Sequence, residues 1–317
     1  MNTVRFILGR LIGALATMLI GALVVFVVMK TAPGDPALAA LGESATPEAV
    51  EAFRKAHNLD APLTEQFITW LKGFVTGDLG RSLTIAGSAP IAELIGARLP
   101  NTIFIGLYAV AFALIISLAM GSISAIRRGR ITDTIATSIA AVGVSMPDFW
   151  LGYVLIFFFA LSLAWFPSYG FMSPLDSLGG AFYTGLLPAV AIAAPMAAIF
   201  ARTLRTALLE NANRDYVTVA TSFGFSRPFV FSHYVFRNSI IPYIVIVGLQ
   251  IRYLLGGVVV VERVFGVPGI GSLMVDAAFA RDFLVVQACT VVFLAIVLSV
   301  NFAVDVVCAM LDPKRTR

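Results

Sequence analysis

The stretch RDYVTVATSFGFSRP, residues 214–228, lies between two long apolar runs, yet it has the pattern of a helix with one apolar side. Its apolar side chains recur at positions i, i+3, i+4 and i+7: Tyr216, Val219, Ala220 and Phe223. An ordinary connection between apolar runs would show no such periodicity. The sequence therefore predicts a short amphipathic helix in this segment.

The residues that follow predict how this helix ends and how the chain continues. Gly224 favours the left-handed backbone conformation that closes a helix at its C-terminus. Ser226 precedes Arg227 and Pro228, the order of a capping residue and the first turn of a new helix. We therefore expect a short helix, a hinge and a second helix that leads into the next apolar run.

The whole chain is strongly apolar. Of its 317 residues, 59% are hydrophobic and 13% are charged, and the mean hydropathy is +0.92. Soluble globular domains carry about 25% charged residues, so this composition excludes a soluble globule. The expected fold class is an all-α polytopic membrane protein.

Six apolar runs are candidates for transmembrane helices, each of which needs about 20 mostly apolar residues. They are residues 11–29, 102–126, 134–166, 186–201, 239–261 and 284–311. The first run is longer than the roughly 7 to 15 apolar residues of a signal peptide, although the ALA sequence at 37–39 resembles a cleavage site. An uncleaved membrane anchor is therefore favoured.

The third run is ambiguous because Pro147 and Asp148 divide it, and two crossings there would move every later loop to the other side. The distribution of basic residues decides the count, since cytoplasmic loops are rich in Lys and Arg. With six spans and both termini cytoplasmic, the inner segments hold 13 basic and four acidic residues, against eight basic and twelve acidic outside. We therefore predict that residues 134–166 form one long, tilted, proline-kinked helix.

This topology puts residues 214–228 in the cytoplasm, where no lipid covers the face of Tyr216, Val219 and Phe223. That face must then dock on another surface, which Ala220 in its middle allows to approach closely. The alternative is that the loop packs only against helices of its own chain.

This loop resembles that of the permease subunits of type I ABC importers, in the peptide, nickel and opine group that includes dipeptide, oligopeptide and glutathione permeases. Their shared signature is the EAA loop, with an alanine, a glycine and a later proline, and Ala220, Gly224 and Pro242 match these positions. DYVTVATSFGF followed by HYVFRNSIIP is similar to the pattern of this group. Thr218 and Val219 stand where the glutamate and alanine that name the loop would be.

Other segments resemble the same group in the same order along the chain. They are APGDPALAALG, GDLGRS, RLPNT, GVSMPDFWLGY, GGVVVVERVFGVPGIGSLMVDA, RDFLVVQ and DPKR. The resemblance implies the permease fold with six transmembrane helices and a small N-terminal periplasmic subdomain. It divides the chain into an N-terminal transmembrane anchor with a periplasmic segment (1–97), the permease core (98–311) and a cytoplasmic tail (312–317).

The resemblance also implies that the short cytoplasmic helix is a coupling helix, which sits in a cleft of an ATP-hydrolysing subunit. The residues that would take this role are Asp215, Tyr216, Ala220, Gly224, Arg237 and Asn238. The implied partners are a second homologous permease subunit, two ATP-binding subunits, a periplasmic substrate-binding protein and membrane lipid, with no nucleic acid. We expect a heterodimeric pore in the bacterial inner membrane, with a homodimer as the alternative.

No residue is expected to be catalytic or to bind a cofactor or a metal. The chain lacks the GxxxxGK[ST] loop that holds ATP phosphates, so ATP and Mg²⁺ are expected on the partner subunits. Neither histidine, His57 or His233, has another likely ligand near it in the sequence. Cys289 and Cys308 lie roughly 28 Å apart along one helix, too far to form a disulfide.

Two other functions compete with import. An intramembrane serine protease would need a histidine at membrane depth to activate its serine, and both histidines lie outside the apolar runs. An ion-driven transporter acting alone would leave the docking helix unexplained, and the sequence shows no convincing internal repeat. Within the importer group, peptide is the favoured cargo because it dominates the group, and nickel, glutathione and opine remain open.

Residues 31–97 form the largest segment outside the membrane. Thr46, Pro47 and Glu48 predict the start of a helix that runs to about His57. A second helix has an apolar face formed by Phe67, Trp70, Leu71 and Phe74. This face can pack on the membrane, on the chain itself or on the binding protein. Residues 262–282 are expected to form a compact cap outside the fifth and sixth spans.

Arg252 lies within the fifth span, where a central arginine costs roughly 2.5 to 3.5 kcal/mol. Gly248 and Gly256 share its stripe at a spacing of four, which favours a stripe that faces other helices. Our hypothesis is that Arg252 lines the translocation path and favours a substrate with a negative group, such as a peptide carboxylate. The alternatives are a structural ion pair with Asp148 and an arginine that extends to the membrane surface. Asp305 is expected to pair with an arginine near the cytoplasmic side.

Overall fold

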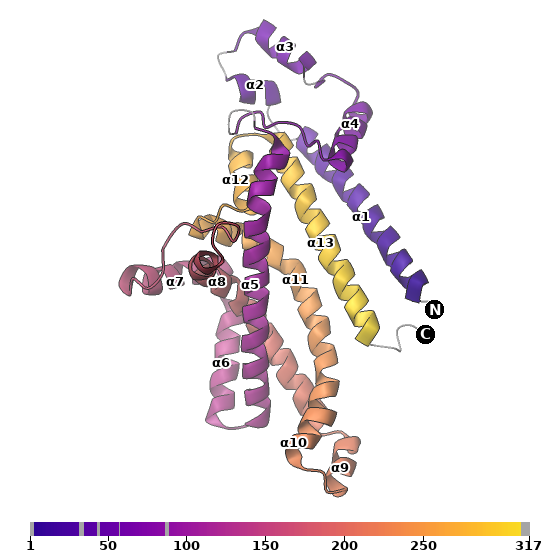
Figure 1. The fold of residues 1–317 in the computed structure, drawn as a ribbon, viewed down its shortest axis with the longest axis vertical. Coiled ribbons are helices and arrows are strands. Elements are labelled where there is room, and N and C mark those ends of the chain that lie inside the picture. Colours follow the sequence, from indigo (N-terminus) through magenta and orange to yellow (C-terminus); the bar gives the residue numbers. More distant parts are fainter. Residues whose placement is uncertain (1–2, 32–34, 43–44, 57, 86–88, 312–317) are drawn as a thin grey trace. The chain divides into compact units, whose positions relative to one another are not determined.

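The computed structural model describes residues 3–31, 35–42, 45–56, 58–85 and 89–311. Within these ranges the side chains of residues 3–6, 36, 39, 252, 253, 255 and 307–311 are not described. The described chain is almost wholly helical, with one isolated β-bridge between Arg81 and Pro90 (Figure 1). It divides into a first unit of Met1–Ile7, Ile103–Val267 and Val300–Arg317 and a second unit of Leu8–Thr102 and Pro268–Ser299.

The first unit is built around one central helix. Its elements are most of α5 (Ile91–Ile126), α6 (Ile131–Ser145), α7 (Asp148–Leu155), the π-helical turn η1 (Ile156–Ser162), α8 (Leu178–Ala212), α9 (Asp215–Ser222), α10 (Arg227–Val230), the π-helical turn η2 (Phe231–Phe236) and α11 (Arg237–Phe265). Helix α8 packs against α6, α7 and α11, and 67% of its most apolar stretch is buried. Many of its buried residues are alanines, whose small side chains let neighbouring helices approach closely.

The third apolar run is not one long helix, so that prediction is wrong. Helix α6 ends at Ser145, α7 begins at Asp148, and the two helical parts of this run are bent by 110°. Met146 and Pro147 between them both have extended backbone, with ψ angles of 128° and 140°. A proline disfavours helical backbone in the residue before it, and two extended residues redirect the chain far more than a kink within a helix.

The structure is consistent with the predicted number of spans. Within the described residues, five helices are long and apolar enough to cross a membrane: Ile7–Thr31, Ile91–Ile126, Leu178–Ala212, Arg227–Ile251 and Phe283–Val306. Two bent helix pairs raise the number of candidate spans to as many as seven, so the predicted six lies within this range. Helix α8 extends well beyond the predicted run at both ends, and Pro188 and Pro195 within it do not interrupt it.

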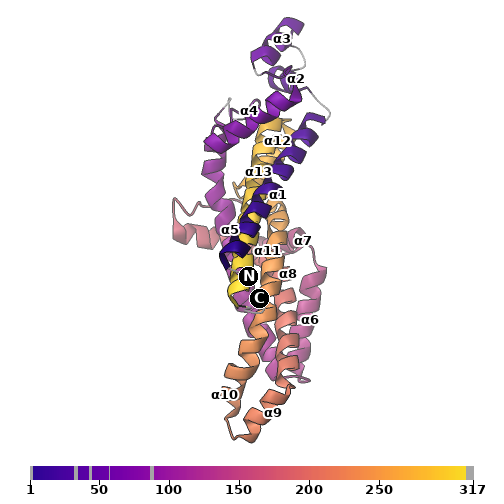
Figure 2. The same ribbon diagram turned by 90° about the vertical axis from the view of Figure 1, so that its right-hand side faces the viewer.

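The second unit contains residues 31–97 and most of residues 262–282, the segments predicted to lie outside the membrane. Its helices are most of α1 (Thr3–Thr31), α2 (Pro36–Leu41), α3 (Pro47–Ala56), α4 (Leu63–Thr76), the first turns of α5, α12 (Ile270–Phe279) and most of the described part of α13 (Phe283–Leu311) (Figure 2). The predicted start of α3 is confirmed, since the Ala49 amide donates to the Thr46 hydroxyl at 3.3 Å. The aromatic face of α4 packs on its own chain, with Phe67 and Trp70 ring centroids 5.3 and 6.2 Å from that of Phe26 on α1.

A buried carboxylate links two distant segments of the second unit. Asp282, which precedes α13, is fully buried. It accepts hydrogen bonds from the Ser82 hydroxyl at 2.6 Å and from the Leu83 and Thr84 amides at 2.8 and 3.0 Å. The segments GDLGRS and RDFLVVQ, about 200 residues apart in sequence, therefore meet at one side chain.

Candidate functional site

The short helix predicted after Arg214 is present as α9. It ends at Ser222, and Gly224, two residues further on, has a φ angle of +82° in the left-handed region. The Phe225 amide donates to the Ala220 carbonyl at 3.4 Å, and the Gly224 amide donates to the Thr221 carbonyl at 3.0 Å. These two bonds form the glycine-ended helix terminus that the sequence predicts.

The predicted second helix is also present, and it leads directly into the fifth span. Ser226 is the residue before α10, although its hydroxyl makes no capping hydrogen bond. Helix α10 continues through η2 into α11, which begins at Arg237. The hinge between α9 and α10 is therefore limited to the few residues around Gly224.

Tyr216 attaches α9 to the ends of two long helices. Its hydroxyl donates to Oδ1 of Asn211, in the last turn of α8, at 2.8 Å. The side-chain amide of Asn238, at the start of α11, donates to the Tyr216 hydroxyl at 3.5 Å and to the Tyr234 carbonyl at 2.7 Å. The geometry thus brings together two of the predicted residues, Tyr216 and Asn238.

Two residues that the sequence did not identify support this contact. Ser239 is fully buried, and its hydroxyl donates to the Ala207 carbonyl at 3.0 Å and to the Val235 carbonyl at 2.8 Å. The Asn211 side-chain amide donates to the Ser239 hydroxyl at 3.1 Å and to the Ala207 carbonyl at 2.9 Å. A polar pair joins α8 to α11 directly behind Tyr216, and the only signal for it in the sequence is two polar residues at the edges of apolar runs.

One side of α9 is apolar and exposed. The exposed fractions of Tyr216, Val219 and Phe223 are 37%, 52% and 78%. Ala220 does not belong to this face, contrary to the prediction, because it is only 5% exposed. Helical geometry puts Val217 and Ala220 roughly 60° apart, on the side that turns towards the rest of the first unit.

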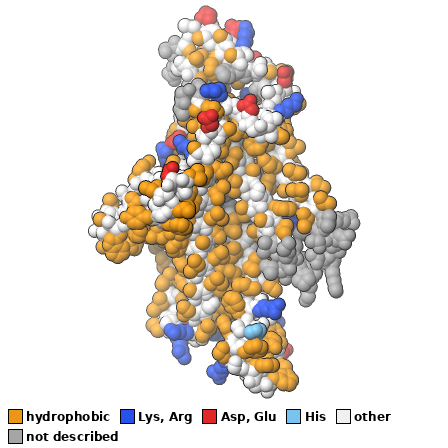
Figure 3. All heavy atoms as spheres, in the orientation of Figure 1, with side chains coloured by type: hydrophobic (Ala, Val, Ile, Leu, Met, Phe, Trp, Pro, Cys, Tyr) orange, Lys and Arg blue, Asp and Glu red, His pale blue; other side chains and the backbone are white. Residues whose placement is uncertain are grey.

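An aromatic stack continues the apolar surface beyond Gly224. The ring centroids of Phe225 and Phe229 lie 5.3 Å apart, and those of Phe229 and His233 lie 4.2 Å apart. Phe225 and Phe229 are 46% and 38% exposed. Hydrophobic side chains and the described histidine are visible at the end of the first unit where α9 and α10 lie (Figure 3).

The remaining predicted coupling residues border this surface. Asp215 is the first residue of α9, where a negative charge interacts favourably with the helix dipole. Arg237 is the first residue of α11, and both Asp215 and Arg237 are exposed. Their exposed charges leave both side chains available to a partner.

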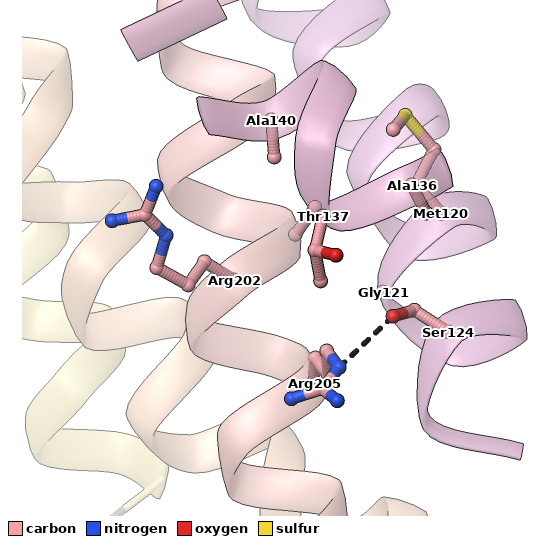
Figure 4. Close-up of a pocket in the computed structure, with 9 residues that line it drawn as sticks. Met120, Gly121, Ser124, Ala136, Thr137, Ala140, Arg202 and Arg205 are labelled. Carbon is pink, nitrogen blue, oxygen red and sulfur yellow. Dashed lines mark hydrogen bonds between the residues drawn. The ribbon is translucent and has the colours of Figure 1, made fainter. Parts of the chain in front are cut away.

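A second polar cluster joins α5, α6 and α8. The Arg205 guanidinium forms two parallel hydrogen bonds to the Asp133 carboxylate, at 2.8 and 2.9 Å. Its Nε also lies 3.0 Å from the Ser124 hydroxyl (Figure 4). The Ser124 hydroxyl and the Gly129 amide donate to the same carboxylate. The cluster borders a cavity of about 30 Å³, roughly the volume of one water molecule. The sequence analysis places Asp133 and Arg205 on the cytoplasmic side but does not predict that they pair.

The chain as a whole matches two family models. Residues 117–317 match the model of the binding-protein-dependent transport system inner membrane component, and residues 3–105 match that of its N-terminal region. The chain belongs to this permease family. The predicted resemblance to type I ABC importer permeases of the peptide group is thereby confirmed.

Relatives of similar length are about one-third identical in sequence to this permease. A putative peptide transport system permease protein of Brucella abortus is 38% identical over 97% of this chain and 98% of its own. The glutathione transport system permease protein GsiC of Escherichia coli K12 is 34% identical over 98% of both chains. Among solved structures, the inward-facing MetNI methionine ABC transporter matches 69% of this chain and 97% of its own, with a TM-score of 0.53 and 17% identity. An amino acid ABC transporter matches 67% of this chain and 92% of its own, with a TM-score of 0.52 and 14% identity.

The candidate path residue of the permease is described only in part. Arg252 lies on α11, but its side chain is outside the described residues. The two glycines that share its helix stripe face different surroundings. Gly248 packs directly against Val304 of α13, whereas Gly256 faces open space. The Asp148 carboxylate lies against the backbone of α11 at Gly257. The described residues contain no group of three or more potential metal ligands.

Proposed function

We propose that this permease imports small peptides, driven by ATP hydrolysed on partner subunits that dock on α9. The observation that carries the proposal is the apolar face of Tyr216, Val219 and Phe223, which is exposed while Tyr216 is bonded to the ends of two spans. Apolar surface in the cytoplasm favours burial against another protein. Movement of a docked subunit would then reach α8 and α11 through Tyr216.

The substrate class follows from the names of the relatives. Those reported above are named for peptide and for glutathione, itself a small peptide. The complete transporter would contain a second homologous permease subunit, two ATP-binding subunits and a periplasmic substrate-binding protein. ATP and Mg²⁺ would be bound by the ATP-binding subunits, with no cofactor on this chain, and both termini would lie in the cytoplasm.

The proposal is tested by placing a charge on the docking face of the whole transporter in vesicles. Phe223→Asp is expected to lower peptide-stimulated ATP hydrolysis and peptide uptake at least tenfold, because burying an unpaired charge at an interface is costly. Thr221→Asp, at an exposed residue on the opposite side of α9, adds the same charge away from the face and is the matched control. Equal loss in both variants, or in neither, would refute docking at this face.

A further inference from the structure

The second unit contains a hollow that the transport mechanism does not use. It has a volume of about 330 Å³ and is lined by parts of α1, the connection before α4, α4, residues 78–83 and the start of α13. An adjoining cavity of about 260 Å³ shares five of its lining residues: Lys30, Leu59, Leu83, Leu284 and Gln287. The two volumes therefore form one hollow centred on these residues, in the size range of small-molecule sites.

Gln287 lines both parts of this hollow and has one unpaired donor atom, Nε2. It is 3% exposed, and its Nε2 atom has no hydrogen-bond acceptor among the described residues. A buried amide donor is costly to leave unpaired, because it has lost its bonds to water. An acceptor atom supplied by a bound molecule would therefore relieve this cost at Gln287.

Lys30 supplies a positive charge to the same hollow. Its Nζ lies 5.8 Å from the centroid of the Phe26 ring, and among the described residues no salt bridge joins it to a carboxylate. The other basic residue of the adjoining part, Arg54, is already paired with Asp35 at 2.6 Å. Lys30 is therefore the cation available to a negatively charged group.

An apolar strip leads from the membrane-spanning part of α1 into the hollow. Leu19, Leu23, Phe26 and Lys30 follow the spacing of one helix face. Leu19 and Leu23 are 50% and 46% exposed, whereas Phe26 is buried against Phe67 and Trp70. Acyl chains on the surface of α1 would reach the hollow along this strip.

Four carboxylates also line the hollow, and two of them, Asp35 and Asp60 in the adjoining part, pair with Arg54 at 2.6 and 4.0 Å. Glu65 and Asp78 border the larger part of the hollow, so its polar side chains carry both signs of charge. A ligand with only a negative group would be repelled by these carboxylates, whereas a ligand with both a negative and a positive group satisfies Lys30 and the carboxylates together.

We propose that the hollow binds a membrane phospholipid whose headgroup carries a phosphate and a primary ammonium. The phosphate accepts from Gln287 Nε2 and pairs with Lys30, and the ammonium faces Glu65 and Asp78. One acyl chain lies along Leu19 and Leu23. A free peptide offers similar charges, but the apolar strip on a membrane span favours the lipid.

The test uses the whole transporter in nanodiscs containing equal amounts of phosphatidylethanolamine and phosphatidylglycerol, followed by native mass spectrometry of the lipids that remain bound. The unmodified transporter is expected to retain phosphatidylethanolamine selectively. Lys30→Gln and Gln287→Leu are each expected to lower that occupancy about tenfold, since each removes a bond to a charged group. Lys72→Gln removes an exposed lysine of α4 outside the hollow and is expected to change nothing.

The variant Gln287→Leu distinguishes a loss of lipid binding from a folding defect. Leucine fills a similar volume and removes an unpaired buried amide, so the melting temperature in lipid-free detergent is expected to stay the same or rise. Equal retention of both lipids, unchanged retention in Lys30→Gln and Gln287→Leu, or displacement of the lipid by added dipeptide would overturn the proposal.

Discussion

The Tyr216 hydroxyl at the start of α9 donates a 2.8 Å hydrogen bond to Asn211 in the last turn of α8. The Asn238 amide at the start of α11 donates to the same hydroxyl at 3.5 Å. A single side chain therefore joins the short helix to two long ones. Behind it, Ser239 and Asn211 join α8 to α11, so the three helix ends form one hydrogen-bonded cluster.

Removal of the Tyr216 hydroxyl is expected to uncouple ATP hydrolysis from transport. Tyr216→Phe keeps the ring and loses a bond with a net value of about 0.5 to 1.5 kcal/mol, which corresponds to a two- to tenfold effect. We expect the number of peptides imported per ATP hydrolysed to fall by that factor in reconstituted vesicles. Tyr153→Phe, on an exposed side chain of α7, is the control. An unchanged ratio in Tyr216→Phe would exclude this route.

Gly224 is expected to tolerate asparagine better than alanine. Its φ angle of +82° costs a residue with a Cβ atom on the order of 1 kcal/mol, and asparagine adopts this region more readily than alanine. Copurification of the ATP-binding subunits should therefore decrease in the order Gly, Asn, Ala. Gly96→Ala, within α5 where a Cβ atom meets open space, should copurify them normally. Equal behaviour of Gly224→Asn and Gly224→Ala would argue against the glycine-ended terminus.

The ion pair between Asp133 and Arg205 is expected to stabilise the first unit. Removing one partner of a fully buried pair costs about 3 to 5 kcal/mol, and less is expected here because the Arg205 side chain is 25% exposed. Asp133→Ala alone should lower the melting temperature of the purified transporter more than Asp133→Ala combined with Arg205→Met. The single variant leaves a partly buried charge, and the double variant removes it. Strictly additive effects would show that the two side chains do not interact.

Loss of the Asp282 carboxylate is expected to release the segment that it holds. In Asp282→Ala the Ser82 hydroxyl keeps the Ile85 carbonyl as an acceptor. The part-buried Leu83 and Thr84 amides lose their acceptor, at a cost of up to roughly 1 to 3 kcal/mol for each donor. The peptide bond after Arg81 should therefore become more sensitive to trypsin. Asp60→Ala, at a carboxylate that is 59% exposed, provides the comparison. Identical cleavage of Asp282→Ala and the unmodified protein would contradict this role.

Arg252 is expected to affect uptake if it lines the path. Arg252→Ala and Arg252→Gln should lower uptake of peptides with a free C-terminal carboxylate more than uptake of the same peptides with an amidated C-terminus. The comparison of the two cargoes within each variant separates cargo recognition from a general folding defect. Equal uptake of both cargoes by correctly folded variants would leave Arg252 with a structural role.

Local signals in the sequence predicted the helices of residues 214–228 with good accuracy. The apolar spacing of α9 depends on helix periodicity alone, and Gly224 depends on backbone sterics alone, so both could be predicted without tertiary contacts. Ala220 was assigned to the wrong side because a helical wheel separates it from Phe223 by only about 60°. Whether Ala220 or Phe223 is covered depends on where α10 and η2 pack against α9.

The ordered motifs of the chain carry its resemblance to the importer permeases. The sequence by itself also determined that the chain is a helical membrane protein and how α9 ends. These properties follow from hydropathy, periodicity and local backbone preference, each of which acts within a few residues. Only the tertiary structure decided the 110° bend at Pro147, the burial of Ala220, the pairing of Asp133 with Arg205 and the meeting of Ser82 with Asp282. Pattern reasoning could not supply these features, because backbone direction at a break and contacts between distant segments depend on packing that no local spacing encodes.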